Sequence, residues 1–258
     1  MLKALPSRRA LGAESAFTLI EVLVAAAASV IVVGAASTIL VVALHQSSQI
    51  NDRVQATELG GITMTKIVDE LRTACLKEKF APVQEESTGQ VLWFVDTFGE
   101  EAAPTQAYEH KIEWTGNASK PTTPGTLVDY RYASEGTWPN FTFNKAQAPT
   151  KTILGENVYM TELEKSKYAP IFEYYRYTTS ATDTSTTPDS DLAAMHLTSS
   201  EKLTSKTAAE AAAVGVSFTA SPSDKYLALN RAAPFSTQVS FALGAPSSEA
   251  TITDGPCR

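Results

Sequence analysis

Cysteine, histidine and basic charge are all scarce in this sequence. It has 2 Cys and 3 His among 258 residues, and 21 Lys and Arg stand against 28 Asp and Glu. From residue 45 onward there are 18 basic and 26 acidic residues. A nucleic-acid groove normally carries a basic excess, because phosphate neutralisation dominates the affinity. We therefore expect no nucleic-acid partner.

Catalytic motifs are missing as well. The sequence contains no Gly-x-Ser-x-Gly, no Walker-type phosphate loop, no His-Glu-x-x-His and no Cys-x-x-Cys. The three histidines, His45, His110 and His196, are far apart in unrelated contexts, and we expect them to be surface or turn residues. The sequence therefore predicts a protein that is not an enzyme, with no catalytic residue, no metal site and no cofactor.

Charge is almost absent from one long apolar run, residues 17–44. Its single ionisable residue is Glu21, near the start. A helix over residues 22–44 spans roughly 35 Å at about 1.5 Å per residue, which is enough to cross a bilayer core. Lys3, Arg8 and Arg9 precede the run, and a nearly neutral stretch follows it. Because positive flanks stay in the cytoplasm, we expect a single-pass membrane protein whose C-terminal domain is extracytoplasmic.

The start of the apolar run resembles the type IV prepilin signature. Glu14-Ser15-Ala16 ends a short polar leader, and Phe17-Thr18-Leu19-Ile20-Glu21 follows. In that family a prepilin peptidase removes the leader before a Phe, the new N-terminus is usually methylated, and a glutamate stands at the fifth mature position. The resemblance implies cleavage between Ala16 and Phe17. Ala16 departs from the glycine that is usual there, although it is also small.

The resemblance implies a structural subunit, a minor pilin or pseudopilin. Its expected partners are prepilin peptidase, other pilin or pseudopilin subunits and the membrane, and its end state is a type IV pilus-like or type II secretion-like filament at the cell surface. A carboxylate in a bilayer costs about 2.5–3.5 kcal/mol unless it has a partner. In the family that partner is the N-terminal amine of a neighbouring subunit, so Phe17 and Glu21 are the expected assembly residues. A packing face that recurs every four positions would let such helices approach closely: Ala26, Val30, Gly34 and Thr38.

Two other interpretations fit parts of this region. A plain, uncleaved anchor could carry an extracytoplasmic binding domain that never polymerises, with Glu21 reaching the headgroups near the helix end. An ordinary secretory signal peptide has an apolar region of only about 7–15 residues, and this run continues well past that length.

Residues 45–82 are predicted to continue the helix in amphipathic form. Apolar and small residues recur three and four apart, which is typical of a helix lying on a core: Ile50, Val54, Thr57, Gly61, Met64, Val68, Leu71 and Cys75, flanked by Ile67 and Ala74. Gly60-Gly61 is expected to bend or loosen the helix, at about 1 kcal/mol per Gly relative to Ala. Pro82 is expected to mark its end.

Residues 83–258 predict a β-rich extracytoplasmic domain. Alternating apolar residues between turn signals indicate strands at 90–96, 108–114, 127–132, 140–143, 171–178, 214–220 and 238–243, and the alanines of 197–214 favour a helix. Residues 178–191, of which nine are Ser or Thr, are expected to form an exposed loop. With the leader at 1–16, the prediction is an α+β fold: a long N-terminal helix packed on an antiparallel sheet, the ladle-shaped architecture of pilins.

Cys75 and Cys257 allow a disulfide in an extracytoplasmic domain. Closing a loop of about 180 residues would contribute roughly 5 kcal/mol in the chain-entropy model. The alternative is two unpaired thiols, with Cys75 behaving as a small hydrophobic residue on the core side of the helix.

Overall fold

The computed structural model describes residues 18–74, 81–100, 103–137, 140–165, 167–177, 192–195, 197, 201–222 and 232–241. The chain divides into two units, Met1–Ser48 and Gln49–Arg258. Helix α1 (Leu19–Arg72) belongs to both, and the second unit contains the remaining elements. These elements are β1 (Val91–Glu100), β2 (Ala103–Trp114), β3 (Gly125–Glu135), β4 (Thr142–Phe143), β5 (Thr150–Tyr159), β6 (Glu162–Glu164), β7 (Lys167–Tyr168), β8 (Phe172–Tyr177), β9 (Leu192–Met195), α2 (Ser205–Ala209), β10 (Ala213–Ala220) and β11 (Ala233–Ser240).

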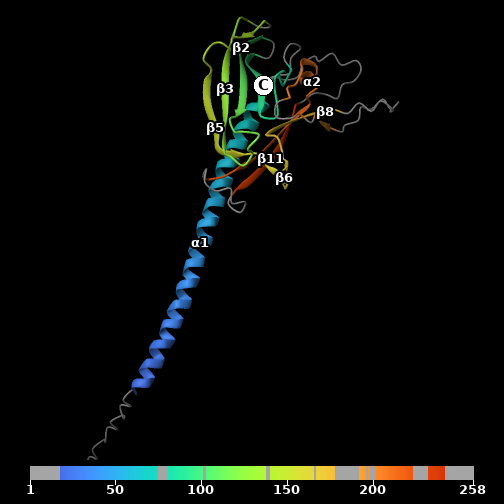
Figure 1. The fold of residues 1–258 in the computed structure, drawn as a ribbon. Coiled ribbons are helices and arrows are strands. Elements are labelled where there is room, and N and C mark those ends of the chain that lie inside the picture. The colour runs from blue at the N-terminus through green and yellow to red at the C-terminus, as the bar shows by residue number, and fades with distance from the viewer. Residues whose placement is uncertain are drawn as a thin grey trace, which may run out of the picture. The chain divides into compact units, whose positions relative to one another are not determined.

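The strands of the second unit form one curled antiparallel sheet and a small hairpin, as predicted for an α+β fold. The order in the sheet is β1-β2-β3-β5-β10-β8-β9, with β11 on β10 and β4 on β3, while β6 pairs with β7 (Figure 1). Strand β10 pairs with β8 over its first half, at Ala213 to Val216, and with β5 at Thr219 and Ala220. One strand therefore joins the two parts of the sheet.

The hydrophobic core lies between the last five turns of α1 and the sheet. Ile67 and Leu71 of the helix are fully buried with Leu92 and Phe94 of β1 and with the inward residues of β2, β3 and β10. The buried indole of Trp114 donates a hydrogen bond from Nε1 to the carbonyl oxygen of Val158, at 2.9 Å. This bond matters because a buried donor without a partner costs about 1–3 kcal/mol.

The predicted stripe of α1 is confirmed toward its end, where Leu71 is buried and Met64 and Val68 pack against the core, and is wrong at its start. Ile50 and Val54 are 63% and 51% exposed. The buried residues of the helix are Ala56, Gly60, Thr63, Ile67 and Leu71. Small side chains occupy the first three of these positions because the sheet comes very close there. A Cβ on Gly155 of β5 would overlap the side chain of Thr63, whose hydroxyl donates a hydrogen bond to the Leu154 carbonyl oxygen at 3.1 Å.

The helix also ends earlier than predicted. It stops at Arg72, ten residues before Pro82, and the amides of Thr73 and Ala74 bond to carbonyl oxygens three residues back. Ala74 then forms an isolated antiparallel bridge with Asp96 of β1. The backbone leaves the helix because Ala74 pairs with the edge strand β1. No residue pattern near Ala74 predicts this contact.

Gly60 and Gly61 are equivalent in the sequence and differ in the structure. Helix α1 is continuous through both, so the predicted loosening is wrong, while the predicted bend stays a prediction. A Cβ at Gly60 would overlap the ring of Phe235, whereas a Cβ at Gly61 meets nothing within 4 Å. Phe235 stacks on buried Phe218 at a centroid distance of 5.5 Å. Gly60 is thus a site of close helix–sheet contact.

Alanine substitutions should separate these two glycines. Gly61→Ala is expected to raise the free energy of unfolding by up to about 1 kcal/mol, because Ala favours the helix. Gly60→Ala has the same propensity gain but must displace Phe235, and overpacking costs about 1–3 kcal/mol, so we expect a net loss of up to about 2 kcal/mol. Thermal unfolding of the full chain in detergent, followed by circular dichroism, measures both. A stabilising Gly60→Ala would contradict the close contact.

Other elements depart from the sequence prediction in detail. Strands β5, β6, β7 and β9 were not predicted, and β11 spans Ala233–Ser240 in place of 238–243. The predicted helix at 197–214 is reduced to α2, because Ala211, Ala212 and Ala213 are buried and lead into β10. Here tertiary burial overrides the helix propensity of alanine.

Candidate functional site

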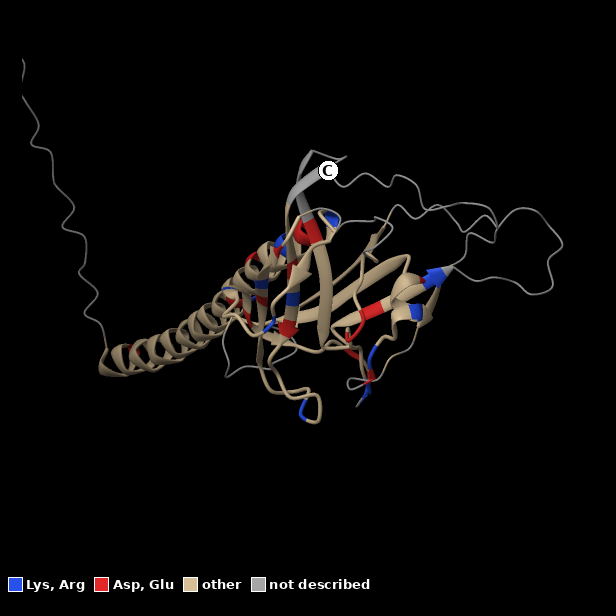
Figure 2. Ribbon diagram, turned by 90° about the horizontal axis from the view of Figure 1, so that it is seen from above, with Lys and Arg blue, Asp and Glu red and all other residues tan. Residues whose placement is uncertain are grey.

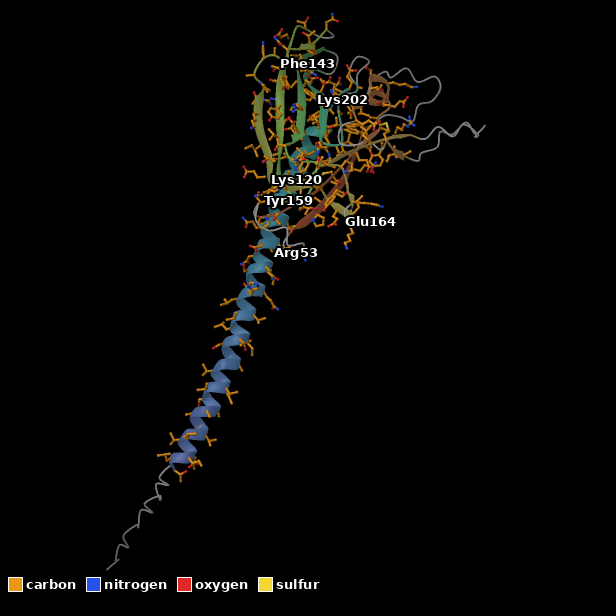
Figure 3. The ribbon with its side chains drawn as sticks, viewed as in Figure 1. Arg53, Lys120, Phe143, Tyr159, Glu164 and Lys202 are labelled. Carbon is orange, nitrogen blue, oxygen red and sulfur yellow. The ribbon has the colours of Figure 1, made fainter. Side chains whose placement is uncertain are left out.

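The first candidate site is the exposed apolar part of α1. No residue from 18 to 48 is buried by the described chain, and the large side chains of residues 19–44 are 54–84% exposed (Figure 3). The helix is long and apolar enough to cross a membrane. Monomeric soluble proteins rarely expose so large an apolar surface, so this one is typical of a membrane anchor.

The hydroxyl groups in this segment bond within the helix. Ser29, Ser37 and Thr38 donate to the carbonyl oxygens of Ala25, Val33 and Ala35 at 2.7–2.8 Å. Such bonds let serine and threonine lie in hydrocarbon without an unsatisfied polar group. A Cβ at Gly34 would have nothing within 4 Å, so this point of the helix surface is open to close approach. Glu21 is therefore the polar side chain of residues 19–44 that most needs a partner.

Glu21 lies in the first turn of α1, and Thr18 precedes the helix. The amide of Glu21 bonds to the carbonyl oxygen of Thr18 at 3.0 Å and lies 3.4 Å from its Oγ1. Thr18 and Glu21 have the spacing of a capping box, and a carboxylate at a helix N-terminus is stabilised by the helix dipole. This local role of Glu21 does not depend on a second subunit.

The other predicted site residues lie outside the described residues. These are Ala16 and Phe17 at the expected cleavage point, and Cys75 and Cys257 of the expected disulfide. The predicted loop at 178–191 lies outside them as well. Cleavage, methylation and the disulfide remain predictions.

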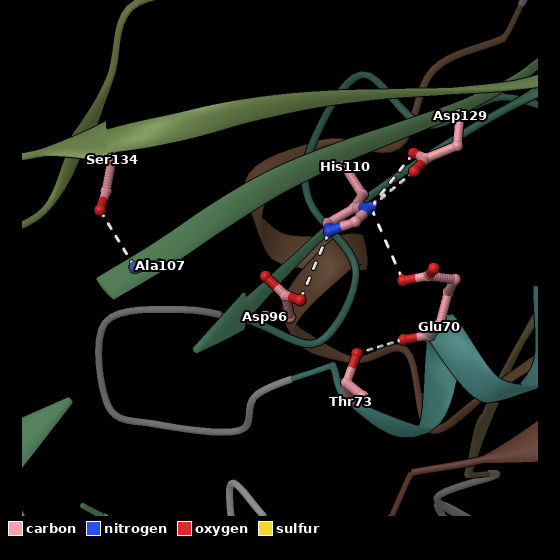
Figure 4. A network of polar contacts seen from close by, with 7 residues as sticks. All are labelled: Glu70, Thr73, Asp96, Ala107, His110, Asp129 and Ser134. Carbon is pink, nitrogen blue, oxygen red and sulfur yellow. Dashed lines mark hydrogen bonds and ion pairs between the residues drawn. The ribbon is translucent and has the colours of Figure 1, made fainter. Parts of the chain in front are cut away.

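The second candidate site is a buried polar cluster that the sequence analysis did not identify. It joins Glu70 in the last turn of α1, Asp96 on β1, His110 on β2 and Asp129 on β3 (Figure 4). His110, Asp96 and Asp129 are only 1%, 2% and 4% exposed. The ring of His110 stacks on Phe94 at 4.8 Å between centroids. A histidine and three carboxylates thus meet at the edge of the hydrophobic core.

The contacts of His110 differ between its two ring nitrogens. Nδ1 lies 3.1 Å from both carboxylate oxygens of Asp129, to which it donates a hydrogen bond, and 4.0 Å from Oε2 of Glu70. Nε2 lies 3.4 Å from Oδ2 of Asp96, without hydrogen-bond geometry. Nε2 and Oδ1 of Asp96 are both buried and have no hydrogen-bond partner. One side of the ring is therefore satisfied and the other is not.

The carboxylates change the proton affinity of the cluster. Burial by itself lowers the pKa of His110. The hydrogen bond to Asp129 and the contact with Asp96 have the opposite and larger effect, so the pKa is raised to about 9. Burial raises the pKa of Glu70, and the positive charge of His110 partly offsets this effect. The cluster therefore favours a positive charge at the imidazole, which strengthens its attachment to Asp129.

The expectation that all three histidines are surface or turn residues is wrong for His110. His45 is exposed on α1, as expected, and His196 lies outside the described residues. A signal for His110 was present in the sequence, because Tyr108, His110, Ile112 and Trp114 alternate along one face of a predicted strand. Its acidic partners carried no such signal, since they come from three other elements.

Lys and Arg are interspersed with Asp and Glu along the elements of the second unit (Figure 2). Several lie beside aromatic rings on the sheet, such as Lys145 and Lys111, which are 4.1 Å and 5.7 Å from the ring centre of Trp93. Lys145 also pairs with Glu109 at 3.2 Å, and Lys111 with Glu113 at 2.6 Å. These cations are therefore neutralised by acidic neighbours.

Comparison with known proteins gives no relative from which a function could be inferred. No family model, no curated protein and no solved structure matches this chain.

Proposed function

We propose that this protein is a structural subunit, a minor pilin or pseudopilin, of a type IV pilus-like or type II secretion-like filament. The observation that carries the proposal is Glu21 at the start of an otherwise uncharged apolar helix, directly after a leader whose junction resembles a prepilin cleavage site. The exposed apolar surface of residues 19–44 supports it, because such a surface can be covered first by lipid and then by neighbouring helices.

In this proposal the same helix serves two stages. In the precursor it anchors the chain in the membrane, with the leader on the cytoplasmic side. Prepilin peptidase then cuts between Ala16 and Phe17 and creates a free amine. That amine, in one subunit, pairs with Glu21 of the next, and the ion pair sets the register of helices whose association is otherwise weakly directional.

The packing of residues 49–72 supports a role as a filament subunit. These turns of α1 are held by the sheet through Ile67, Leu71 and the close contacts at Gly60 and Thr63. One part of α1 thus carries the folded domain, and the other part is free to pack with the same helix of other subunits. This arrangement suits a filament subunit. We propose the ladle-shaped architecture of pilins for the chain as part of this function.

A second candidate is a single-pass anchored binding domain that does not polymerise. The place of Glu21 in the first turn of α1 favours it, because the helix dipole stabilises a carboxylate there without a neighbouring subunit. In that case the leader stays attached and the chain remains in the membrane as a monomer.

N-terminal sequencing of the protein purified from membranes and from sheared surface material distinguishes the two. The filament proposal expects the mature chain to begin at Phe17, with or without methylation, and a strain lacking prepilin peptidase should accumulate the uncut form. An intact Met1 in all fractions, unchanged by loss of the peptidase, would establish the anchored domain.

A further inference from the structure

We propose that Glu70, Asp96 and His110 bind one divalent transition-metal ion of the zinc class. Each residue offers one ligand atom, and the three atoms lie within 4.8 Å of one another. The ion would join the last turn of α1 to β1 and β2. This inference does not depend on the filament proposal, because the cluster lies wholly within the second unit.

The separation of two of the donors fits a metal ion between them. Zinc binds imidazole nitrogen and carboxylate oxygen at about 2.0–2.2 Å, so two donors of a tetrahedral site are about 3.4 Å apart. Nε2 of His110 and Oδ2 of Asp96 are 3.4 Å apart. At this distance their geometry is unsuited to a direct hydrogen bond, and both groups are almost fully buried.

The unsatisfied atoms lie on the side where the ion would bind. Nε2 of His110 and Oδ1 of Asp96 have no hydrogen-bond partner, although their side chains are 2% and 3% exposed. Buried polar atoms are paired in the great majority of cases, so two unpartnered atoms on side chains that contact one another need a cause. A cation bound between the two side chains would give Nε2 a partner and would neutralise the carboxylate of Asp96.

Asp129 holds the other side of the imidazole as in known metal sites. A histidine that binds a metal usually donates its second ring N–H to a carboxylate, which sets the tautomer and the ring orientation. Asp129 accepts this bond from Nδ1 with both oxygens at 3.1 Å. The stacking of the ring on Phe94 also restricts its rotation. Nε2 is thereby directed toward Asp96.

The charge of the cluster also favours a cation. Three carboxylates surround one imidazole in a region of low dielectric, where unpaired negative charge is expensive. Among the described cations, Arg131 acts on Glu70, but its guanidinium stacks on the ring of Tyr108 at 4.6 Å. A divalent ion would offset the remaining negative charge where it is most buried.

The donor set indicates the class of metal. Imidazole nitrogen suits zinc and other first-row transition ions, whereas calcium and magnesium prefer sites made of oxygen alone. Glu70 is the ligand that has to adjust, because its Oε2 lies 4.0 Å from Nδ1, the nitrogen that bonds Asp129; its side chain is 39% exposed at the end of the helix and has room to move. It also offers a path of entry for the ion and leaves room for a water ligand.

The test measures zinc binding by the full chain in detergent. After treatment with chelator, the protein is titrated with Zn²⁺ and separately with Co²⁺, whose visible absorption reports the coordination geometry. We expect one ion per chain, a tetrahedral Co²⁺ spectrum, and no comparable binding of Ca²⁺. In Asp96→Asn and His110→Gln the affinity should fall by at least about 100-fold, and in Asp129→Asn by about 10–100-fold.

Glu70→Gln and a matched control keep the test decisive. Glu70 is half-exposed, so its glutamine variant should fold, and we expect it to weaken zinc binding at least tenfold. Glu164→Gln removes a carboxylate that is 70% exposed on the β6–β7 hairpin (Figure 3) and should bind zinc as the parent chain does. If zinc does not bind, or binds equally well to Glu70→Gln and Glu164→Gln, the cluster is a proton-bearing ion-pair network and the proposal is overturned.

Discussion

Glu21→Gln is expected to remove the protein from filaments while leaving it in the membrane. Glutamine has nearly the same shape and preserves the backbone contact with Thr18, but it cannot form an ion pair. The amine of the neighbouring subunit would then lie unpaired in an apolar core, and leaving one partner of a buried pair alone costs about 3–5 kcal/mol. Because about 1.4 kcal/mol is a factor of ten in an equilibrium, we expect incorporation to fall at least tenfold. The ratio of subunit in sheared filaments to subunit in membranes measures it.

Thr18→Ala is the matched control for the local role of Glu21. It removes the hydroxyl that caps the helix and leaves the carboxylate in place, at a cost of about 1 kcal/mol to the first turn. The filament proposal expects incorporation close to that of the parent chain. Equal loss in Thr18→Ala and Glu21→Gln would show that capping of the helix, and not the charge of Glu21, is what matters. Normal incorporation of Glu21→Gln would contradict the pairing role.

His110→Gln is expected to lower the free energy of unfolding by about 3–5 kcal/mol, measured in the presence of chelator. The imidazole is the shared partner of Asp96 and Asp129, and its removal leaves two buried carboxylates without a positive charge. Such a loss is a large fraction of the stability of an ordinary domain. Chemical denaturation of the full chain in detergent, followed by tryptophan fluorescence, measures the change.

A double-mutant cycle and an outer pair provide the controls for this prediction. His110→Gln with Asp129→Asn should cost less than the sum of the two single variants, because groups in one network are not additive. Glu113→Gln breaks the partly exposed pair with Lys111 and should cost no more than about 1 kcal/mol. If His110→Gln costs as little as Glu113→Gln, the buried cluster does not hold α1 to the sheet. This result is independent of zinc affinity, so the two properties can be told apart.

Local patterns predicted the class of the fold and several strands. The alternation in residues 108–114 and 214–220 indicated β2 and β10, because a strand with one buried face repeats every two residues. The same patterns missed β5, whose sequence includes Gly155 and Asn157, the latter with a φ of +53°. Its pairing with β3 shifts register twice. Such irregular strands are held by their neighbours more than by their own residue preferences.

The two candidate sites also differ in whether local patterns could predict them. The apolar run and Glu21 could be recognised from the sequence because both are local: a span is defined by length and composition, and a single charge within it is conspicuous. The cluster of Glu70, Asp96, His110 and Asp129 could not, because its members lie on four elements and are brought together by strand pairing and by the end of α1. The only local sign of this cluster in the sequence was His110 on the inner face of a predicted strand.

The sequence by itself determined that this chain has a long, nearly uncharged helix with one acid at its start, and that a β-rich domain follows. Those properties depend on composition and periodicity, which act within a few residues. The tertiary structure decided which face of α1 is buried, where the helix ends, that Gly60 and Gly61 differ, and that a buried histidine meets three carboxylates. Each of these depends on contacts between residues distant in the chain, and the close packing of helix against sheet selects among patterns that are locally equivalent.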